Sequence, residues 1–491
     1  MSNSSSSNPI ILTPGGQREV VDLEKAMDII SQWKPILDQQ QQSTTASTTT
    51  PNIYKIDLSD KSWTIEAAQQ IANFLTSTEI YNPPLATFIQ IANLNDIIAS
   101  RMEEEGLQVL KTLSDVFECS TNLIEVDLSD NAMGSKGVSQ CHAVLSSKCR
   151  GGNITLERLS LCNNGLSEYS MNEIADLLTE EACLNNEGQD DDDEKKNTMM
   201  CIAENLTKIH FFNNMSGNEG CKAFERIMNK CSSKLTDIRF SSTRARREGS
   251  EYIAKALMTL ANDGRLHNVT QLDLCDNSFA ECYTTLADAL STCLNLEYLN
   301  LKDCILASEG VEAVCNALIK ANPPLKVIHL SGNEIDADGA KFVAKIVKKF
   351  NASIEILNVE ENEMTSIGIK RIVKNLNAPR LTKLILSENE CGRIGVNALI
   401  ECVDKIPSLE SIELDRNNFS DEMVDELKEA FGDKLEEMED IFGEEEEDDE
   451  DDDEDEEDEE EEDEPEESAE EISKDTADID DLAGAMSNIG I

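Results

Sequence analysis

From Ile53 onward the apolar residues of the chain recur in one frame, Leu-x-x-Leu-x-Leu-x-x-Asn-x-Leu, in which other apolar residues also occupy the leucine positions. The segments that begin at Leu123 and Leu156 match every apolar position and the asparagine. Clear copies begin at Val269, Leu325, Ile354, Leu381 and Leu409, and weaker copies begin at Ile53, Leu206, Leu235 and Leu296. The alternation of apolar and polar positions in each copy predicts a short strand.

The spacing of the copies indicates a helix after each strand. Between residues 277 and 417 the asparagine position recurs every 27 to 29 residues, which leaves room for a full helix in each unit. Residues such as Val311, Val314 and Leu318 form the apolar stripe of one such helix. Because a single unit cannot bury both its strand and its helix stripe, the units must stack. The sequence therefore predicts an α/β leucine-rich-repeat solenoid, a ribonuclease-inhibitor-like horseshoe with a parallel inner sheet and outer helices.

The asparagine of the frame is expected to be structural. Where the chain leaves a strand, a buried side-chain amide can pair with backbone groups that the turn leaves without partners. A cysteine can take the same place. This role is predicted for Asn131, Asn164, Asn277, Asn333, Asn362, Asn389 and Asn417, with Cys304 as the substitute.

Composition divides the chain into three regions. Residues 1–52 are rich in Ser, Gln and Thr and are expected to be mostly disordered, with a short amphipathic helix between Val20 and Leu37. Residues 53–438 form the repeat domain, with a polar acidic insert at 185–197. The segment 421–431 is expected to be a helix that covers the end of the stack. Residues 439–491 are expected to be a disordered acidic tail.

Charge and cysteine content narrow the class of partner. The net charge is −56, and residues 444–470 hold 24 acidic residues and no basic one. Such a chain repels nucleic acid and anionic lipid and attracts basic proteins. The fifteen cysteines include no Cys-x-x-Cys pair, which favours free buried thiols in a reducing compartment. No apolar run approaches the ~20 residues that span a bilayer, so we expect no membrane insertion.

No motif for chemistry of its own is found. The sequence holds no phosphate-binding Gly-x-x-x-x-Gly-Lys loop, no Gly-x-Gly-x-x-Gly and no His-Glu-x-x-His, and its four histidines lie in different repeats. We therefore expect no cofactor, no bound metal and no active site for a small substrate. A binding surface is the better hypothesis.

The best candidate for that surface is the position just before the asparagine of each frame. It is mostly acidic, and it holds Asp130, Asn163, Asn213, Asp276, Asp303, Glu361 and Glu388. Any one of these residues could be an ordinary solvated turn residue. Their shared character along one edge favours a surface that docks a basic patch of a partner.

Two blocks resemble a known family. The blocks LIEVDLSDNAMGSKGV (123–138) and LERLSLCNNGLS (156–167), together with the acidic edge and the acidic tail, resemble the Ran GTPase-activating proteins. The resemblance covers roughly residues 53–470. It implies a protein that binds no nucleotide itself and speeds GTP hydrolysis on a Ran-type small GTPase in its GTP form, with a Ran-binding protein as a further partner. It also implies a role in nucleocytoplasmic transport, in the cytoplasm and at the cytoplasmic face of the nuclear envelope.

The resemblance assigns two residues. The functional asparagine of the family aligns with Asn163, which would order the GTPase's own catalytic glutamine without an arginine finger. An arginine of the family aligns with Arg101, as a contact or scaffold residue, with Ser100 in place of the usual glycine. From the residues alone, Asn163 could instead cap the next helix, and Arg101 could form a surface ion pair with an acid between Glu103 and Glu105.

Two other functions share these features. A ribonuclease-inhibitor-like protein would have the same repeat length and acidity, but such inhibitors use many aromatic residues, whereas this chain has 2 Trp and 6 Tyr. An acidic histone-binding protein would explain the tail but not the repeats. Release of phosphate from Ran·GTP by substoichiometric protein separates the three.

Overall fold

The computed structural model describes residues 9–42, 53–148, 154–183 and 199–438. Over these residues thirteen parallel strands form one sheet in which each strand pairs with the strand of the next repeat. The order from one end of the sheet to the other is β1 (Ile10–Leu12), β3 (Ile53–Asp57), β5 (Ile91–Asn93), β6 (Glu125–Asp127), β7 (Arg158–Ser160), β10 (Lys208–Phe212), β11 (Asp237–Ser241), β12 (Gln271–Asp273), β13 (Tyr298–Asn300), β14 (Val327–His329), β15 (Ile356–Asn358), β16 (Lys383–Ile385) and β17 (Ser411–Glu413).

A helix or a helical turn comes between each strand of the main sheet from β3 onward and the next one, and a last helix comes after β17. The helices are α1 (Leu23–Gln42), α2 (Ile65–Thr76), α3 (Glu103–Asp115), α4 (His142–Leu145), α5 (Glu168–Thr179), α6 (Gly217–Lys230), α7 (Arg247–Asn262), α8 (Tyr283–Leu290), α9 (Ala307–Ala321), α10 (Ala340–Phe350), α11 (Thr365–Lys374), α12 (Arg393–Cys402) and α13 (Asp421–Phe431). The 3₁₀ turns are η1 (Leu85–Phe88), η2 (Val116–Cys119), η3 (Val138–Gln140), η4 (Ile202–Asn205), η5 (Val403–Lys405) and η6 (Gly432–Lys434).

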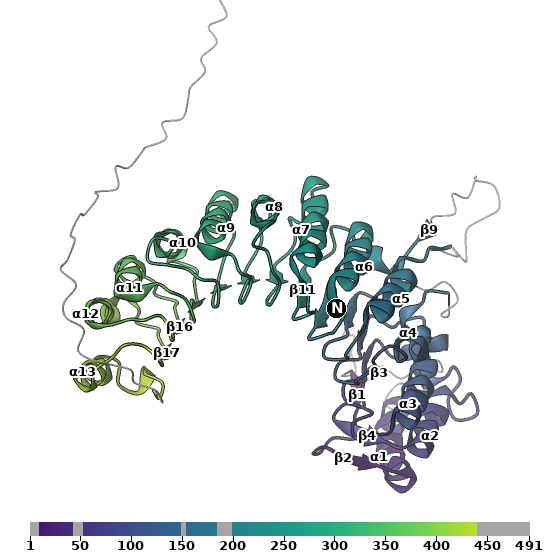
Figure 1. Cartoon of the computed structure of the whole chain (residues 1–491). Coiled ribbons are helices and arrows are strands. Elements are labelled where there is room, and N and C mark those ends of the chain that lie inside the picture. Colours follow the sequence, from purple (N-terminus) through teal and green to yellow (C-terminus); the bar gives the residue numbers. More distant parts are fainter. Residues whose placement is uncertain (1–8, 43–52, 149–153, 184–198, 439–491) are drawn as a thin grey trace, which may run out of the picture. The chain divides into compact units, whose positions relative to one another are not determined.

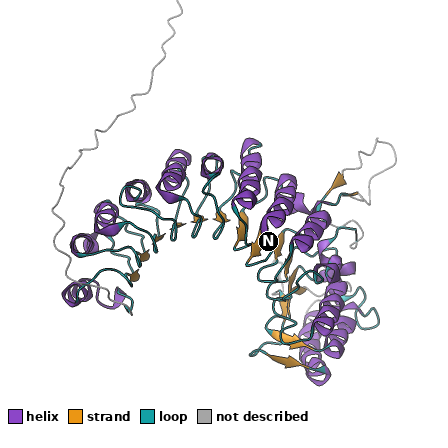
Figure 2. Ribbon diagram, in the orientation of Figure 1, coloured by secondary structure: helices purple, strands orange, loops and turns teal. Residues whose placement is uncertain are grey.

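The repeats stack into an arc with the strands on its inner side and the helices on its outer side (Figures 1 and 2). Two small pairings lie outside the main sheet. They are the parallel pair β2 (Glu19–Val21) with β4 (Lys61–Trp63), and the antiparallel pair β8 (Ala182–Cys183) with β9 (Met199–Met200). None of the described helices is both long and apolar enough to cross a membrane.

The core is built from the apolar positions of the frame. Leu123, Val126 and Leu128 are fully buried, as are the same positions in the other copies. The helix stripes close the other side of each layer, so that one continuous core runs from Ile10 to Phe431. Each layer can bury its apolar side chains only against its neighbours, which is why the predicted solenoid is confirmed as a single stack.

The frame asparagines bind the repeats to one another, as predicted. Asn333 donates from Nδ2 to the carbonyl oxygens of Leu301, Leu330 and Ser331 at 2.8 to 3.1 Å. Its Oδ1 accepts from the backbone N–H of Cys304 at 3.2 Å. The other buried members donate from Nδ2 in the same way, and Asn214 joins the series. The members are Asn131, Asn164, Asn214, Asn277, Asn333, Asn362, Asn389 and Asn417.

Four repeats fill the asparagine position differently, and one of them, the repeat of β5, holds Ile97 there. Cys304 is buried there, and its Sγ lies 3.3 Å from the carbonyl oxygen of Leu274, as expected of the substitute. Thr243 takes the position in the repeat of β11. In the first repeat the position holds Lys61, which is only 1% exposed. The Lys61 ammonium donates to the carbonyl oxygen of Gln17.

The expectation that residues 1–52 are mostly disordered is wrong for residues 9–42. β1 pairs with β3 and extends the main sheet, and α1 packs on α2. Trp33 of α1 is 2% exposed, donates from Nε1 to the carbonyl oxygen of Thr13 at 3.0 Å and lies against Phe74. The amphipathic helix was expected, but its purpose was not: it covers the apolar face that the first repeat would otherwise expose to water.

At the other end, the expected terminal helix is confirmed as α13. Ser420 caps its first turn by accepting from the N–H of Met423, and Val424, Leu427 and Phe431 are buried beneath it. The predicted repeat domain ends at residue 438, the last described residue of this part. The acidic insert 185–197, the tail 439–491, and residues 1–8 and 43–52 of the first region lie outside the described residues.

Asn164→Ala is expected to lower the free energy of unfolding by about 1–3 kcal/mol, because the N–H of Asn131 loses its acceptor inside the stack. Urea unfolding followed by circular dichroism measures the change. The adjacent Asn163→Ala is the matched control and should lose clearly less stability, because the Asn163 side chain is exposed and only the left-handed backbone disfavours alanine there. Equal stability of the two variants would contradict the role given to Asn164.

Trp33→Ala is expected to lower the free energy of unfolding by about 3–5 kcal/mol, because a large buried ring is removed from the end of the stack. Met27→Ala, in the same helix, is the control, since Met27 is 55% exposed. Thermal unfolding of both variants checks the prediction. A Trp33→Ala protein as stable as the control would mean that α1 is not part of the cooperative fold.

Candidate functional site

The candidate surface runs along the edge of the stack where the chain leaves the strand of each repeat. The residue just before the frame position has a left-handed backbone in every repeat from β3 onward, with φ between 50° and 65°. We call these twelve positions the rim residues. They are Asp60, Asp96, Asp130, Asn163, Asn213, Ser242, Asp276, Asp303, Gly332, Glu361, Glu388 and Arg416. Asn and Asp tolerate this conformation better than most other side chains do.

The backbone of the rim is fixed by the neighbouring repeat. The N–H of Asp130 donates to the carbonyl oxygen of Cys162 at 2.9 Å, and the N–H of Asn163 donates to that of Phe212 at 2.6 Å. Asp276, Asp303, Glu361 and Glu388 make the same bond to the next repeat, at 2.8 to 3.0 Å. Each rim side chain therefore projects from a backbone that cannot readily move.

Asn163 is exposed and lies beside the asparagine series rather than within it. Its neighbour Asn164 is fully buried in that series. The alternative that Asn163 caps the next helix is wrong, because Ser167 is the N-cap of α5 and accepts from the N–H of Ser170 at 3.3 Å. The Asn163 side chain instead contacts two other rim residues. Its Nδ2 donates to Asp130, and its Oδ1 accepts from Asn213.

The other predicted rim residues also lie on this edge. Asp276 and Glu361 are exposed. Asp303 is half-buried, and this burial raises its carboxyl pKa above the ordinary value. Glu388 accepts from Nη1 of Arg416 at 2.9 Å. Asp60 and Asp96 extend the acidic character into the first two repeats, whose weak frames hid them from the sequence analysis.

Arg101 holds two repeats together. Its Nε donates to Oγ of Ser62 at 2.9 Å, and its Nη1 donates to Oε1 of Glu105 at 3.0 Å. Only 14% of its side chain is exposed, so the surface ion pair considered from the sequence is better described as a half-buried bridge. Ser100 has φ of 62°, which explains why a glycine suits this position. This geometry fits a scaffold residue more closely than a contact residue.

One basic cluster interrupts the rim and was missed. Arg244 and Arg246 are exposed in the turn after β11, and Arg247, the first residue of α7, pairs with Glu281 at 2.5 Å. The signal was available, since three arginines occur within four residues. The rim is therefore acidic on both sides of a short basic turn.

The inner face of the sheet carries paired charges. His210 lies 2.7 Å from Asp237, and Nε of Arg239 lies 3.0 Å from Asp273. The Arg239 guanidinium also stacks over the ring of Phe212, 3.9 Å from its centroid. His329 is mostly buried beside Tyr298, and this burial lowers its pKa. His210 and Arg239 are thus each paired with a carboxylate of the next strand.

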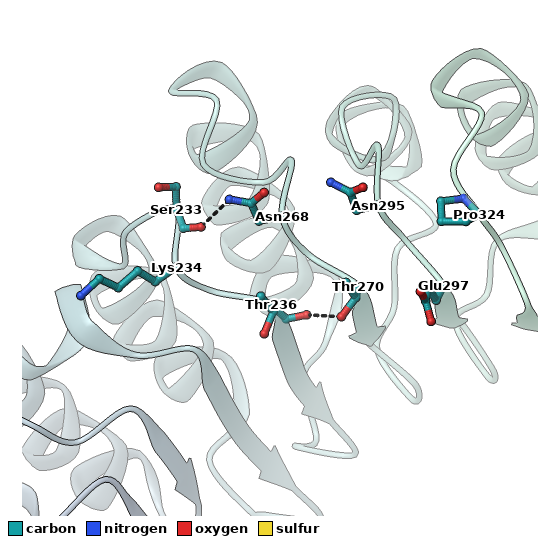
Figure 3. Close-up of a pocket in the computed structure, with 8 residues that line it drawn as sticks. All are labelled: Ser233, Lys234, Thr236, Asn268, Thr270, Asn295, Glu297 and Pro324. Atoms are coloured by element: carbon teal, nitrogen blue, oxygen red, sulfur yellow. Dashed lines mark hydrogen bonds between the residues drawn. The ribbon is translucent and has the colours of Figure 1, made fainter. Parts of the chain in front are cut away.

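A groove of about 400 Å³ lies at the opposite edge, where the chains enter their strands (Figure 3). Its polar groups already have partners in the stack. Asn268 donates to the carbonyl oxygen of Ser233 at 2.8 Å, and Thr270 donates to that of Thr236 at 3.1 Å. The groove is thus a seam between repeats and gives no reason to expect a small ligand.

Cysteine and metal chemistry find no support among the described residues. Twelve of the cysteines are free thiols, and most of these twelve are buried. Burial raises the pKa of the Cys231 thiol to about 12, so this thiol is not a reactive thiolate at neutral pH. Within the same part of the chain no cluster of His, Cys, Asp or Glu could hold a metal ion.

Comparison with known proteins supports the family suggested by the sequence. A leucine-rich-repeat family model matches residues 119–139, 292–315 and 321–344. The chain is 26% identical over 290 residues to Ran GTPase-activating protein 1 of Saccharomyces cerevisiae and 31% identical over 134 residues to RAN GTPase-activating protein 1 of Arabidopsis thaliana. The chain thus carries leucine-rich repeats and is similar over part of its length to two Ran GTPase-activating proteins.

The matches cover only parts of these relatives. The yeast match spans 57% of this chain and 63% of the yeast protein, and the Arabidopsis match spans 27% and 21%. A mouse NACHT, LRR and PYD domains-containing protein 14 is 25% identical over 46% of this chain and 19% of its own length. Among solved structures, a TLR13–ssRNA13 complex aligns with a TM-score of 0.35 and 16% identity over 77% of this chain and 45% of that chain.

Arg101→Ala is expected to lower the free energy of unfolding by about 1–3 kcal/mol, because Ser62 and Glu105 lose charged hydrogen-bond partners in a half-buried place. Arg246→Ala is the control, since it removes an exposed arginine and should change stability by less than about 0.5 kcal/mol. Chemical unfolding of both variants is the measurement. A stability unchanged by Arg101→Ala would leave contact with a partner as the better explanation of this residue.

Proposed function

We propose that this protein stimulates GTP hydrolysis on a Ran-type small GTPase in its GTP form. It orders the GTPase's own catalytic glutamine and inserts no arginine finger. The names of the relatives support the partner. The observation that carries the mechanism is the exposed amide of Asn163, which projects from a fixed left-handed turn and is not needed by the asparagine series.

An amide is suited to this task. The catalytic glutamine of a small GTPase orients the attacking water, and phosphoryl transfer depends mainly on positioning and on stabilisation of charge. An asparagine side chain offers one acceptor and two donor hydrogens, so it can pair with a second amide in a defined orientation. A protein that holds the glutamine in its working pose therefore accelerates hydrolysis without contributing a charge of its own.

The mostly acidic rim supplies the docking surface. Asp130, Asp276, Asp303, Glu361 and Glu388, with the neutral Asn213 among them, would face a basic patch of the GTPase. Charges of this kind steer association and set orientation more than they add affinity. Because exposed charges are screened within about 8–10 Å at physiological salt, the association rate should fall as salt is raised. Arg101 supports this surface by holding the first repeats together.

The cellular setting belongs to the same proposal. A Ran-binding protein would join the complex, and the protein would act in nucleocytoplasmic transport from the cytoplasm, including the cytoplasmic face of the nuclear envelope. Fluorescent tagging of the full chain tests the location: exclusion from the nuclear interior is expected, and accumulation inside the nucleus would oppose the proposal.

Asn163→Ala is expected to reduce the stimulated rate of GTP hydrolysis by about 100-fold or more, because the amide that positions the glutamine is lost. Phosphate release from Ran·GTP under substoichiometric protein is the measurement. Asn268→Ala is the matched control: it removes an exposed asparagine at the opposite edge of the stack and should retain full activity. Unchanged phosphate release by Asn163→Ala would refute the proposed mechanism.

A further inference from the structure

Four side chains from consecutive repeats form one chain of hydrogen bonds along the edge of the stack. Nδ2 of Asn95 donates to Oδ2 of Asp130 at 2.7 Å, and Nδ2 of Asn163 donates to Oδ1 of the same carboxylate at 2.7 Å. Nδ2 of Asn213 then donates to Oδ1 of Asn163 at 2.9 Å. Asp130, Asn163 and Asn213 are all exposed, so this chain does not serve the core.

The carboxylate gives this chain a direction. An ionised aspartate can only accept hydrogen bonds, whereas an asparagine can turn either its oxygen or its nitrogen toward a neighbour. Asp130 therefore requires the nitrogen of Asn163 to face it. The oxygen of Asn163 must then face the next repeat, where Asn213 presents its nitrogen. One charged residue thus determines the orientation of three amides, those of Asn95, Asn163 and Asn213.

The orientation decides what Asn163 can offer to a partner. After its two contacts along the rim, the amide keeps one N–H on the side of Asp130 and one acceptor site on the side of Asn213. If the amide turned end for end, its oxygen would meet a carboxylate and its nitrogen would meet another nitrogen. Both hydrogen bonds would be lost. A partner amide therefore meets a donor and an acceptor whose order is already set.

We propose that Asp130 and Asn213 are positioning residues that fix the direction of the Asn163 amide before the GTPase docks. This inference rests on the proposed function and adds to it. In docking, only the charge of Asp130 would matter, because Asn213 is uncharged. In the positioning role the arrangement of hydrogen-bond donors and acceptors matters as well. Substitutions at the two positions can change the net charge and this arrangement separately.

The buried asparagine series does not depend on this chain. In that series the backbone N–H of Asn131 donates to Oδ1 of Asn164, and the backbone N–H of Asn164 donates to Oδ1 of Asn214. The rim residues Asp130, Asn163 and Asn213 are attached to the stack by their backbone N–H groups. Substitution of their side chains should therefore leave the fold intact, and each variant of the test should unfold cooperatively, with Asp130→Ala slightly below the wild-type temperature because alanine tolerates the left-handed backbone less well.

The test uses catalytic amounts of the full chain and measures hydrolysis of Ran·GTP, with kcat and KM determined separately. Asp130→Ala removes the acceptor and should lower kcat by about 10-fold or more, because the amide loses its fixed direction. Asp130→Asn keeps an oxygen that can accept from Asn163, while Asn95 is free to turn its own amide. This variant should retain most of kcat while KM rises through the lost charge.

Asn213→Asp tests the direction itself. It places a second acceptor beside the oxygen of Asn163, so kcat should fall about as far as in Asp130→Ala. The double variant Asp130→Asn with Asn213→Asp restores a complete chain of hydrogen bonds, but with the Asn163 amide reversed. Its net charge equals that of the wild type, so its KM should be close to the wild-type value. Its kcat should stay low, because the donor and acceptor have exchanged places.

Two results would overturn the inference in distinguishable ways. If the wild type does not stimulate hydrolysis, the proposed function fails and this inference fails with it. If the wild type is active but Asp130→Ala keeps the wild-type kcat, or the double variant recovers it, then the function stands and the positioning role is wrong. If only KM changed in all variants, Asp130 and Asn213 would act in docking and not in positioning the amide.

Discussion

The structure depends on a buried asparagine at the point where the chain leaves the strand of most repeats. A strand that turns sharply inside a stack leaves backbone N–H and carbonyl groups without partners, and a buried unpaired group costs about 1–3 kcal/mol. The asparagine side chain pairs with several of these groups at once, partly in its own repeat and partly in the one before. Between residues 277 and 417 this position recurs every 27 to 29 residues, so that the same turn is repeated at the end of each strand. The apolar core supplies the stability, and the asparagine makes the turn possible.

The same turn produces the candidate site. Because the residue before the asparagine adopts a left-handed backbone, its side chain projects outward while its N–H stays bonded to the next repeat. A buried amide and an exposed one therefore stand side by side at Asn164 and Asn163. The first serves the fold and the second is available for a partner. The proposed function uses a position whose backbone the fold requires but whose side chain makes no contact in the core.

Much of this could be predicted from the sequence, and the failures have physical causes. The strong frames at Leu123 and Leu156 predicted the strands, the buried asparagines and the exposed rim, because one period fixes which side chains face inward. The terminal unit formed by residues 9–42 was missed, since β1 is three residues long and carries no frame. The repeat of β5 was also hidden, because Ile97 occupies its asparagine position and relies on Asn131 for its hydrogen bond. Hydrogen bonds between rim side chains, such as that from Asn163 to Asp130, join residues 33 positions apart, and no local pattern reports them.

The parallel sheet also sets a regular spacing between the rim residues. Neighbouring strands of a sheet lie about 4.8 Å apart, so the turns at their ends recur at nearly that interval along the edge. A partner must match this interval as well as the chemistry of each step. Duplication or loss of a whole repeat would then move one half of the surface by one step relative to the other while each turn keeps its conformation. Insertion of a single residue within a repeat would instead disturb the turn itself. The choice of partner in such a protein can therefore change most readily through the gain or loss of whole repeats.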